Sequence, residues 1–362
     1  MVGITSTLAR MRIGLFLAYW PWFSLEEQVD LAILGDELGL DSVWISEAWG
    51  QDAVSVLGLL AGRTERIALG SGLMQIPARQ PAATAMAAAS LDVISGGRFR
   101  LGLGVSGPQV SEGWYGVPFA RPLTRTREYV EIVRRALARE PLEHHGEAFT
   151  LPLDEAHGGG GLGKPLKLLA TPVSERIPIY LGAIGPRALE QTGEIADGWL
   201  PFLFNPERPE VMLDPVRRGA ERAGRALRDI DVAPVVPVVV DDDPAAARAM
   251  GKPWLAFYLG AMGAKTKNFY VDVAERYGYG DSARACQERA LAGDRAGAVE
   301  AISDELIDAA AICCEPAELP ARLAAYEAAG ADTLVAVPTG DKAAVVRALG
   351  EAAAVAGGQA VG

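Results

Sequence analysis

Apolar runs of strand length alternate with amphipathic stretches along most of the chain. The runs are RIGLFLAY at 12–19, DSVWIS at 41–46, RIALGSG at 66–72, RFRLGLGV at 98–105, IPIYLGAI at 177–184, DGWLPF at 197–202, VAPVVPVVV at 232–240 and ADTLVAVP at 331–338. Because these runs are too apolar for one face of the strand to be exposed to solvent, they are typical of parallel strands covered by helices. Between them, the spacing of apolar residues predicts helices over 24–39, 54–64, 81–94, 123–138, 186–196, 209–227 and 318–330. Ser24 and Glu27 form a capping box at the start of the first helix, and Gly39 ends it.

The alternation predicts an α/β fold, a (β/α)8 TIM barrel with insertions. Residues 11–340 would form this single domain, and the pattern breaks near 141–175 and 244–303, where we expect insertions. Residues 1–10 would be an N-terminal extension, and 341–362 a C-terminal helix and tail. The rival fold is a doubly wound open sheet, but its G-x-G-x-x-G motif is missing after the first run.

Composition narrows the classes of partner. The net charge is −12 and the pI is near 4.9, which disfavours binding to nucleic acid or to anionic membranes. We find neither a run of about 18 uncharged apolar residues nor the layout of a signal peptide, so we expect a cytoplasmic protein. Cys286, Cys313 and Cys314 are interpreted as buried thiols.

The carboxyl ends of the strands are where a barrel places its chemistry. Glu47 follows the second run, and Ser106, Gly107 and Pro108 follow the fourth. Four aromatic residues also lie there: Tyr19, Trp20, Trp22 and Trp49. They would either bind a flat conjugated ligand or only cover the end of the barrel.

Gly182, Gly185 and Pro186 follow the fifth run and begin a helix. Free amides at such a helix start bind anions, although a plain turn would look the same. The three histidines all lie in the first insertion, with no thiol or carboxylate at ligand spacing, and we expect surface residues and no metal. A nucleophile elbow is also missing. The chain offers few residues that could transfer protons in catalysis. This favours an enzyme with a redox cofactor, because such a cofactor performs the difficult chemical step itself.

Four segments carry a resemblance to a known family: GSGLMQIPARQP, AAASLDVISGGRFRLGLGVSGPQVSEGW, RPLTRTREYVEIVRRAL and GEIADGW. Together they resemble the bacterial-luciferase-like superfamily, in its branch of coenzyme F420-dependent oxidoreductases related to methylenetetrahydromethanopterin reductase. The resemblance runs from about Met11 to Pro338. It implies a hydride transfer between C5 of the deazaflavin and an organic small molecule.

The resemblance also implies site residues. A non-prolyl cis peptide between Gly72 and Leu73, followed by Met74, would support the central ring of the cofactor, with Glu47 beside it. Glu47 could instead be a buried structural carboxylate. The remaining cofactor-binding positions would be Ser106, Gly107 and Pro108 along the ribityl chain, and Gly182, Ala183, Gly185 and Pro186 at the phosphate.

One position departs from the family pattern. The sugar-phosphate dehydrogenases of this branch carry a histidine as proton-transfer base directly after the acidic residue of the second strand, and this chain has Ala48. We therefore do not expect that activity. The proton would come from Glu47, Tyr19, Tyr115 or water, and we name Glu47 and Tyr19 as the catalytic candidates.

Two other functions stay open. An FMN-dependent monooxygenase would use the same bulge and phosphate turn, and a cofactor-binding barrel without turnover would need no proton shuttle. The small residues of 81–94 favour close helix packing, either inside the domain or in a homodimer like those of the superfamily. The sequence leaves the substrate and the direction of hydride transfer undetermined.

Overall fold

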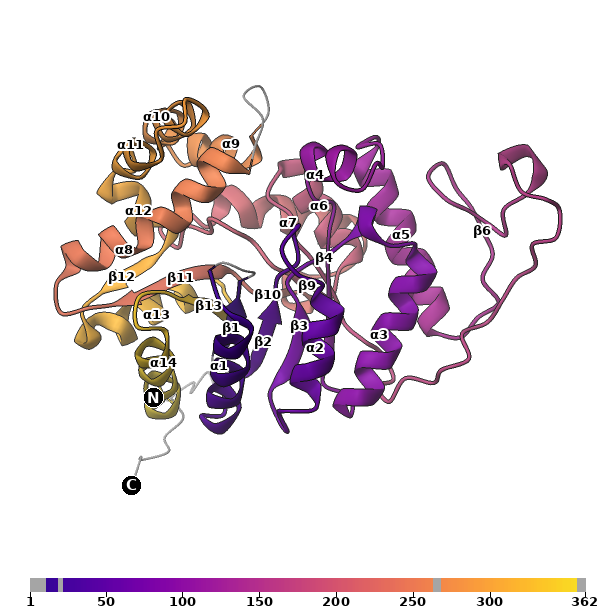
Figure 1. The fold of residues 1–362 in the computed structure, drawn as a ribbon, viewed down its shortest axis with the longest axis horizontal. Helices are drawn as coiled ribbons and strands as arrows, with labels where there is room; N and C mark the ends of the chain where they lie inside the picture. The colour runs from indigo at the N-terminus through magenta and orange to yellow at the C-terminus, as the bar shows by residue number, and fades with distance from the viewer. Residues whose placement is uncertain (1–10, 19–21, 263–267, 357–362) are drawn as a thin grey trace, which may run out of the picture.

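The computed structural model describes residues 11–18, 22–262 and 268–356. Parallel strands form one curled sheet (Figure 1). In order around the sheet the strands are β1 (Arg12–Leu17), β2 (Ser42–Ile45), β3 (Ala68–Ser71), β5 (Phe99–Gly104), β8 (Ile179–Leu181), β9 (Gly198–Trp199), β10 (Asp231–Val232) with β11 (Val235–Val240), and β13 (Thr333–Pro338). Strand β10 pairs with β9, β11 pairs with β13, and β13 pairs with β1, so the sheet closes. The predicted TIM barrel is confirmed.

Helices cover the outside of the barrel. They are α1 (Leu25–Glu37), α2 (Ala53–Ala61), α3 (Pro81–Ser95), α5 (Pro122–Leu137), α6 (Pro186–Ile195), α7 (Glu210–Arg222), α13 (Leu319–Ala328) and α14 (Lys342–Ala356). The predicted capping box is present at the start of α1, where Ser24 and Glu27 each accept the backbone N–H of the other. The capping box fixes the start of the first helix at the position that the hydrophobic pattern predicted.

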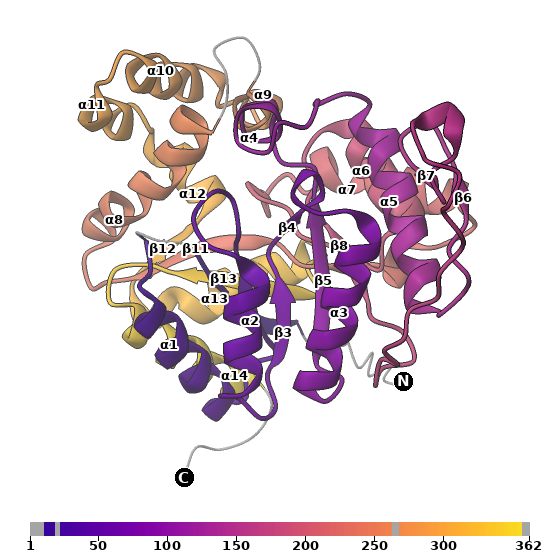
Figure 2. The same ribbon diagram turned by 45° about the vertical axis from the view of Figure 1, so that its right-hand side comes forward.

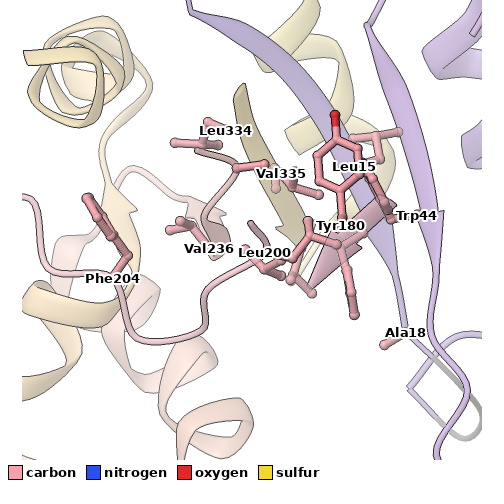
Figure 3. Packing of buried hydrophobic residues seen from close by; sticks show 14 of the residues in the cluster. Leu15, Ala18, Trp44, Tyr180, Leu200, Phe204, Val236, Leu334 and Val335 are labelled. Carbon is pink, nitrogen blue, oxygen red and sulfur yellow. The ribbon is translucent and has the colours of Figure 1, made fainter. Parts of the chain in front are cut away.

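Aromatic residues and glycines share the interior of the barrel. The rings of Trp44 and Tyr180 meet at 4.8 Å between centroids in the buried cluster of Figure 3. A Cβ on Gly70 would lie 2.2 Å from the Trp44 ring, and one on Gly198 would lie 2.1 Å from the Tyr180 ring. Two large rings therefore fit inside only because the strands beside them carry no side chain at these points.

The two interruptions of the pattern fold differently. Residues 141–175 contain a hairpin of β6 (His144–His145) and β7 (Thr150–Leu151) and the short helix η2 (Glu155–His157), and they extend away from the barrel in Figure 1. Residues 244–303 contain α8 (Pro244–Ala256), the π-helical turn η4 (Phe257–Ala261), α9 (Phe269–Arg276), α10 (Gly280–Leu291) and α11 (Arg295–Glu300). Helix α12 (Asp304–Ala310) follows them.

Besides the two short strands of the hairpin, the strand after α12 was not predicted either. Ile312–Cys314 forms β12, which pairs with β11 outside the closed ring of strands. Three residues between two helical segments give too short a pattern to be recognised. The interpretation of the three cysteines is confirmed, since all are buried free thiols. Short helices η1 (Ile76–Ala78), η3 (Leu227–Asp229) and η5 (Pro316–Glu318) complete the connections.

Candidate active site

The chain bulges between β3 and the short strand β4 (Met74–Gln75), which pairs with β5. The peptide bond between Gly72 and Leu73 is cis, at the two residues where the resemblance places one. Ser71 Oγ accepts the N–H of Gly102 and donates to its carbonyl, both at 2.9 Å. A Cβ on Gly72 would lie 2.7 Å from the Phe16 ring, so glycine is required there for lack of space. The strand pattern ends at this position because regular pairing with β5 stops at Gly70 and resumes only at Met74.

Leu73 rests on three glycines of neighbouring strands. Cβ atoms on Gly102, Gly104 and Gly182 would lie 3.0, 2.8 and 2.1 Å from its methyl carbons. Leu73 is half-buried, whereas the side chain of Met74 is buried in the core. Of these two candidate residues, only Leu73 therefore keeps part of its side chain exposed.

Glu47 is held by an arginine that the sequence analysis missed. Its two carboxylate oxygens accept from Arg79 Nη1 and Nη2 at 2.9 and 2.7 Å, and one of them also accepts the Gln75 N–H at 2.9 Å. Arg79 also pairs with Asp52, the N-cap of α2. Burial lowers the pKa of Arg79, but Glu47 and then Asp52 outweigh this and raise it. Glu47 therefore has the partners of a structural carboxylate.

Gln75 connects this ion pair to the loop after α4 (Pro108–Gly113). Its Nε2 donates to the Ala48 carbonyl at 2.5 Å and to the Tyr115 hydroxyl at 3.2 Å. Ala48, at the position of the missing histidine, has a φ of +51°. Burial, followed by the charge of Glu47, raises the pKa of the Tyr115 hydroxyl. Tyr115 is thus a protonated phenol at neutral pH, close to the bulge.

Ser106, Gly107 and Pro108 form the connection from β5 into α4, and all three are half-buried. Ser106 adopts a left-handed φ of +61°, which turns the chain sharply after the strand. Gly107 is the N-cap of α4, and Pro108 is its first residue. The predicted trio therefore lies at the same end of the barrel as the bulge.

Gly182, Ala183, Gly185 and Pro186 form the turn from β8 into α6. Gly185 is the N-cap of α6, without a side-chain cap, and open space surrounds the position of its missing Cβ. Trp199 Nε1 donates a hydrogen bond to the Ala183 carbonyl at 2.9 Å. The first amides of α6 are free of a capping side chain, as an anion site requires.

Arg276 of α9 reaches this turn from the second insertion, and its Nη2 donates to the Ile184 carbonyl at 2.5 Å. Burial lowers the pKa of Arg276, and an arginine still keeps its charge at neutral pH. Helix α9 lies beside α4 at this end of the barrel in Figures 1 and 2, so the second insertion covers the end that carries the bulge. Arg276 thus adds a positive charge to the predicted phosphate turn.

The other candidates lie in different surroundings. Tyr19 and Trp20 are outside the described residues. Trp22 is half-buried, with its ring 5.4 Å from that of Trp254, while Trp49 is exposed. His144 is buried beside Glu128, contrary to the expected surface position, because the hairpin folds it onto α5. No cluster of three potential metal ligands occurs in the parts of the chain that the structure describes.

Comparison with known proteins places the chain in a family. The model of the luciferase-like monooxygenase family matches residues 6–333. The chain belongs to this family. A Mycobacterium tuberculosis protein provisionally assigned as a coenzyme F420-dependent oxidoreductase is 42% identical over 330 residues, 90% of this chain and 95% of that protein. The 5,10-methylenetetrahydromethanopterin reductase of Methanolobus tindarius is 33% identical over 295 residues, 81% of this chain and 84% of the reductase.

A solved structure of the family agrees with the fold. The coenzyme F420-dependent tetrahydromethanopterin reductase from Methanopyrus kandleri superposes with a TM-score of 0.81 at 28% identity. The match covers 95% of this chain and 98% of that reductase. The predicted resemblance to the F420-dependent branch of the superfamily is therefore confirmed.

Proposed function

We propose that this chain is a coenzyme F420-dependent oxidoreductase, which transfers a hydride between the cofactor and a small organic substrate. One observation carries the assignment: Gly182 belongs to the phosphate turn and also faces Leu73 of the bulge, with its missing Cβ only 2.1 Å from Leu73 Cδ1. A ring on the bulge and a phosphate at α6 would thus belong to one ligand. When bound, coenzyme F420 supplies a hydride donor or acceptor at C5.

The residues around the bulge fit such a group. Leu73 would press on the ring, while Ser106, Gly107 and Pro108 would line the chain that leads to the phosphate. Gly182, Ala183, Gly185 and Pro186 would let the phosphate approach the uncapped amides of α6. Arg276 would add charge there. The protein contributes orientation and exclusion of water, which suits hydride transfer at contact distance.

Glu47 acts in this proposal as a positioning residue. Its oxygens are engaged by Arg79 and by the Gln75 N–H, so it anchors the chain after the bulge instead of carrying a proton. Tyr115 is the better proton source. Its oxygen accepts from Gln75, and since the described residues offer its hydroxyl proton no acceptor, the proton is available to the substrate. Tyr19 stays a sequence-based candidate.

The direct test is a titration of the apoprotein with coenzyme F420 and, separately, with FMN, followed by ligand fluorescence. We expect micromolar or tighter binding of the deazaflavin and weak binding of FMN. A preference for FMN would move the chain to the monooxygenase function. Tight F420 binding without hydride exchange across a broad set of substrates would favour a cofactor-binding barrel instead.

The proposal includes a homodimer. Met86, Val93 and Ile94 are exposed along one side of α3, and Leu59 is exposed on α2, which packs against it. Exposed apolar residues on two neighbouring helices suit a second copy of the chain. Light scattering at micromolar concentration should give twice the monomer mass, and Met86→Lys with Ile94→Glu should give the monomer. A wild-type monomer would contradict this part of the proposal.

The compartment is inferred from the thiols. Among the described residues, no helix has the length and apolar character needed to cross a lipid bilayer. Three free buried cysteines are typical of a reducing compartment, and we place the protein in the cytoplasm on that ground. Cell fractionation tests this placement.

A further inference from the structure

The last part of the first insertion lies across the ends of α5 and α3. We call residues 162–173 the strap, and they have no regular secondary structure. The strap is nevertheless held at both helices. The Leu166 carbonyl accepts the N–H of Leu142, shortly after α5, at 2.9 Å. The Val173 N–H donates to the buried carboxylate of Asp92 in α3 at 2.7 Å. The strap is therefore a fixed part of the surface.

Apolar side chains of the strap are exposed to solvent. Leu162 and Leu169 are 93% and 92% exposed, and Leu166 and Val173 are exposed as well. Holding a segment in one conformation costs conformational entropy, and here the ordered segment leaves its leucines uncovered. Neighbouring apolar residues that are both ordered and exposed mark a site of contact with another molecule.

The two helices beside the strap have no exposed charge. Helix α2 contains no charged residue, and the only one in α3, Asp92, is buried and bound to the strap. By contrast, α5 and α7 cover the same barrel with several arginines and glutamates each. A helix on the outside of a soluble protein normally turns charged residues toward the solvent. The strap therefore continues the uncharged surface of α2 and α3 that the proposed homodimer would cover.

The two edges of this surface carry opposite charges. Helices α1, α2 and α3 follow one another around the barrel, with the strap beyond α3 (Figure 1). The strap has no acidic residue, and its Lys164 and Lys167 are exposed. Helix α1 has no basic residue, and its exposed Glu26, Asp30 and Glu37 share one helix face. Within the described chain, none of these five residues forms an ion pair. Each edge thus lacks the counter-charge that the other edge offers.

We propose that a second copy of the chain covers this surface, and that the strap of each copy binds α1 of the other. This inference rests on the homodimer of the proposed function and names the segments that join it. A two-fold axis that runs parallel to α2 and α3, between them, exchanges the two edges of the surface. Each strap then lies against α1 of the other copy, so that its leucines are buried and its lysines meet carboxylates.

Exchange of the charges tests the pairing directly. Lys164→Glu with Lys167→Glu should raise the dissociation constant of the full-length dimer at least about tenfold at low salt, measured by analytical ultracentrifugation. Glu26→Lys with Asp30→Lys should weaken the dimer similarly. The chain with all four changes should regain most of the wild-type affinity, because the charges are again opposite. Absence of this rescue would overturn the inference.

The control makes the same change in net charge elsewhere. Arg228→Glu with Arg295→Glu alters two exposed positions that lie outside this surface, and it should keep the wild-type dissociation constant. A control that weakens the dimer as much as the strap variant would reduce the effect to overall charge and overturn the pairing.

The leucines are tested separately. Leu162→Ser with Leu169→Ser should raise the dissociation constant about tenfold or more. The stability of the monomer should not change, because both side chains are almost fully exposed in it. Leu291→Ser on α10, outside this surface, is the control and should leave the dissociation constant unchanged. If the strap variant keeps the dimer intact, its leucines are not in the interface.

The outcomes separate this inference from the proposed function. A monomeric wild type would contradict the homodimer itself. A dimer that Met86→Lys with Ile94→Glu dissociates, but that the strap variants leave intact, would overturn only the strap contact. Binding of the wild type to phosphatidylglycerol vesicles, lost in Lys164→Glu with Lys167→Glu while the dimer stays intact, would make the strap a membrane contact and overturn the inference as well. Failure to bind coenzyme F420 would leave the strap contact standing.

Discussion

The two sides of the barrel mouth are built in different ways. The side that carries the proposed cofactor is shaped by glycines: at 72, 102, 104 and 182 a Cβ would lie less than 3.0 Å from a neighbouring atom, and at Gly102 that atom belongs to the backbone. Glu47 is fixed there by Arg79. The side formed by the second insertion is shaped by exchangeable apolar side chains on helices. A glycine with a backbone atom in contact cannot be replaced cheaply, whereas an apolar lining tolerates new shapes. The glycine-lined side should therefore tolerate substitution less well than the side covered by the second insertion.

The largest expected effect is at the contact between the bulge and β5. A Cβ in Gly102→Ala would lie 1.9 Å from the Ser71 carbonyl oxygen, a backbone atom that cannot move away alone. We expect a loss of about 3 kcal/mol in the free energy of unfolding, together with loss of F420 binding, measured by urea denaturation and fluorescence titration. Gly58→Ala on α2, where nothing lies within 4 Å, is the control and should be neutral or slightly stabilising. Equal stability of the two variants would disprove the tight contact.

The ion pair gives the next largest effect. Arg79→Met leaves Glu47 buried without its cation, which should cost about 2 kcal/mol, below the usual value for a buried pair because Arg79 is partly exposed. The control is Arg217→Met, which removes an exposed pair with Asp214 and should cost less than about 0.5 kcal/mol.

Glu47→Gln separates positioning from proton transfer. A positioning role predicts a lower rate of hydride transfer with an unchanged shape of the pH–rate profile. Disappearance of one limb of that profile would instead make Glu47 the proton carrier.

Acid should weaken the barrel through Asp41. Burial alone would raise its pKa, but Arg100, at 2.6 Å, outweighs this and holds the pKa of Asp41 below its ordinary value. Its stabilising contribution is therefore complete above the unfolded pKa of about 3.9 and is lost as the pH falls toward the folded value. We expect about 1 kcal/mol of acid sensitivity from this pair, and Asp41→Asn should flatten the acid limb of stability against pH. An unchanged limb would rule the pair out as its source.

The smallest change in stability is expected at Gly182. The new methyl group of Gly182→Ala meets only the flexible end of Leu73, so unfolding should change by about 1 kcal/mol or less. Because Leu73 is pushed toward the cofactor position, F420 should bind about tenfold more weakly. Gly62→Ala, with an ordinary contact distance of 3.7 Å, serves as the control. Unaltered F420 affinity would place the ring elsewhere.

Local signals account for what the sequence predicted. Apolar runs, the Ser24 capping box and the Gly-Pro start of α6 each depend on neighbouring residues only. The partners of Glu47 and Ile184 were missed because they come from distant parts of the chain: Arg79 follows Glu47 by 32 residues, and Arg276 follows Ile184 by 92. The arginine in IPARQP, a charge in an otherwise uncharged turn, was the only hint of the first. For Arg276, the pattern of α9 offered none.

The contact between Trp22 and Trp254 has a spectroscopic consequence. It joins the segment after β1 to helix α8, with the two indole rings 5.4 Å apart and inclined at 75°. Energy transfer between two indoles depends on their separation and angle, so a movement of α8 that separates these rings should change the emission of this pair. Among the seven tryptophans of the chain, this pair is therefore the one whose emission would report on the junction between β1 and the second insertion.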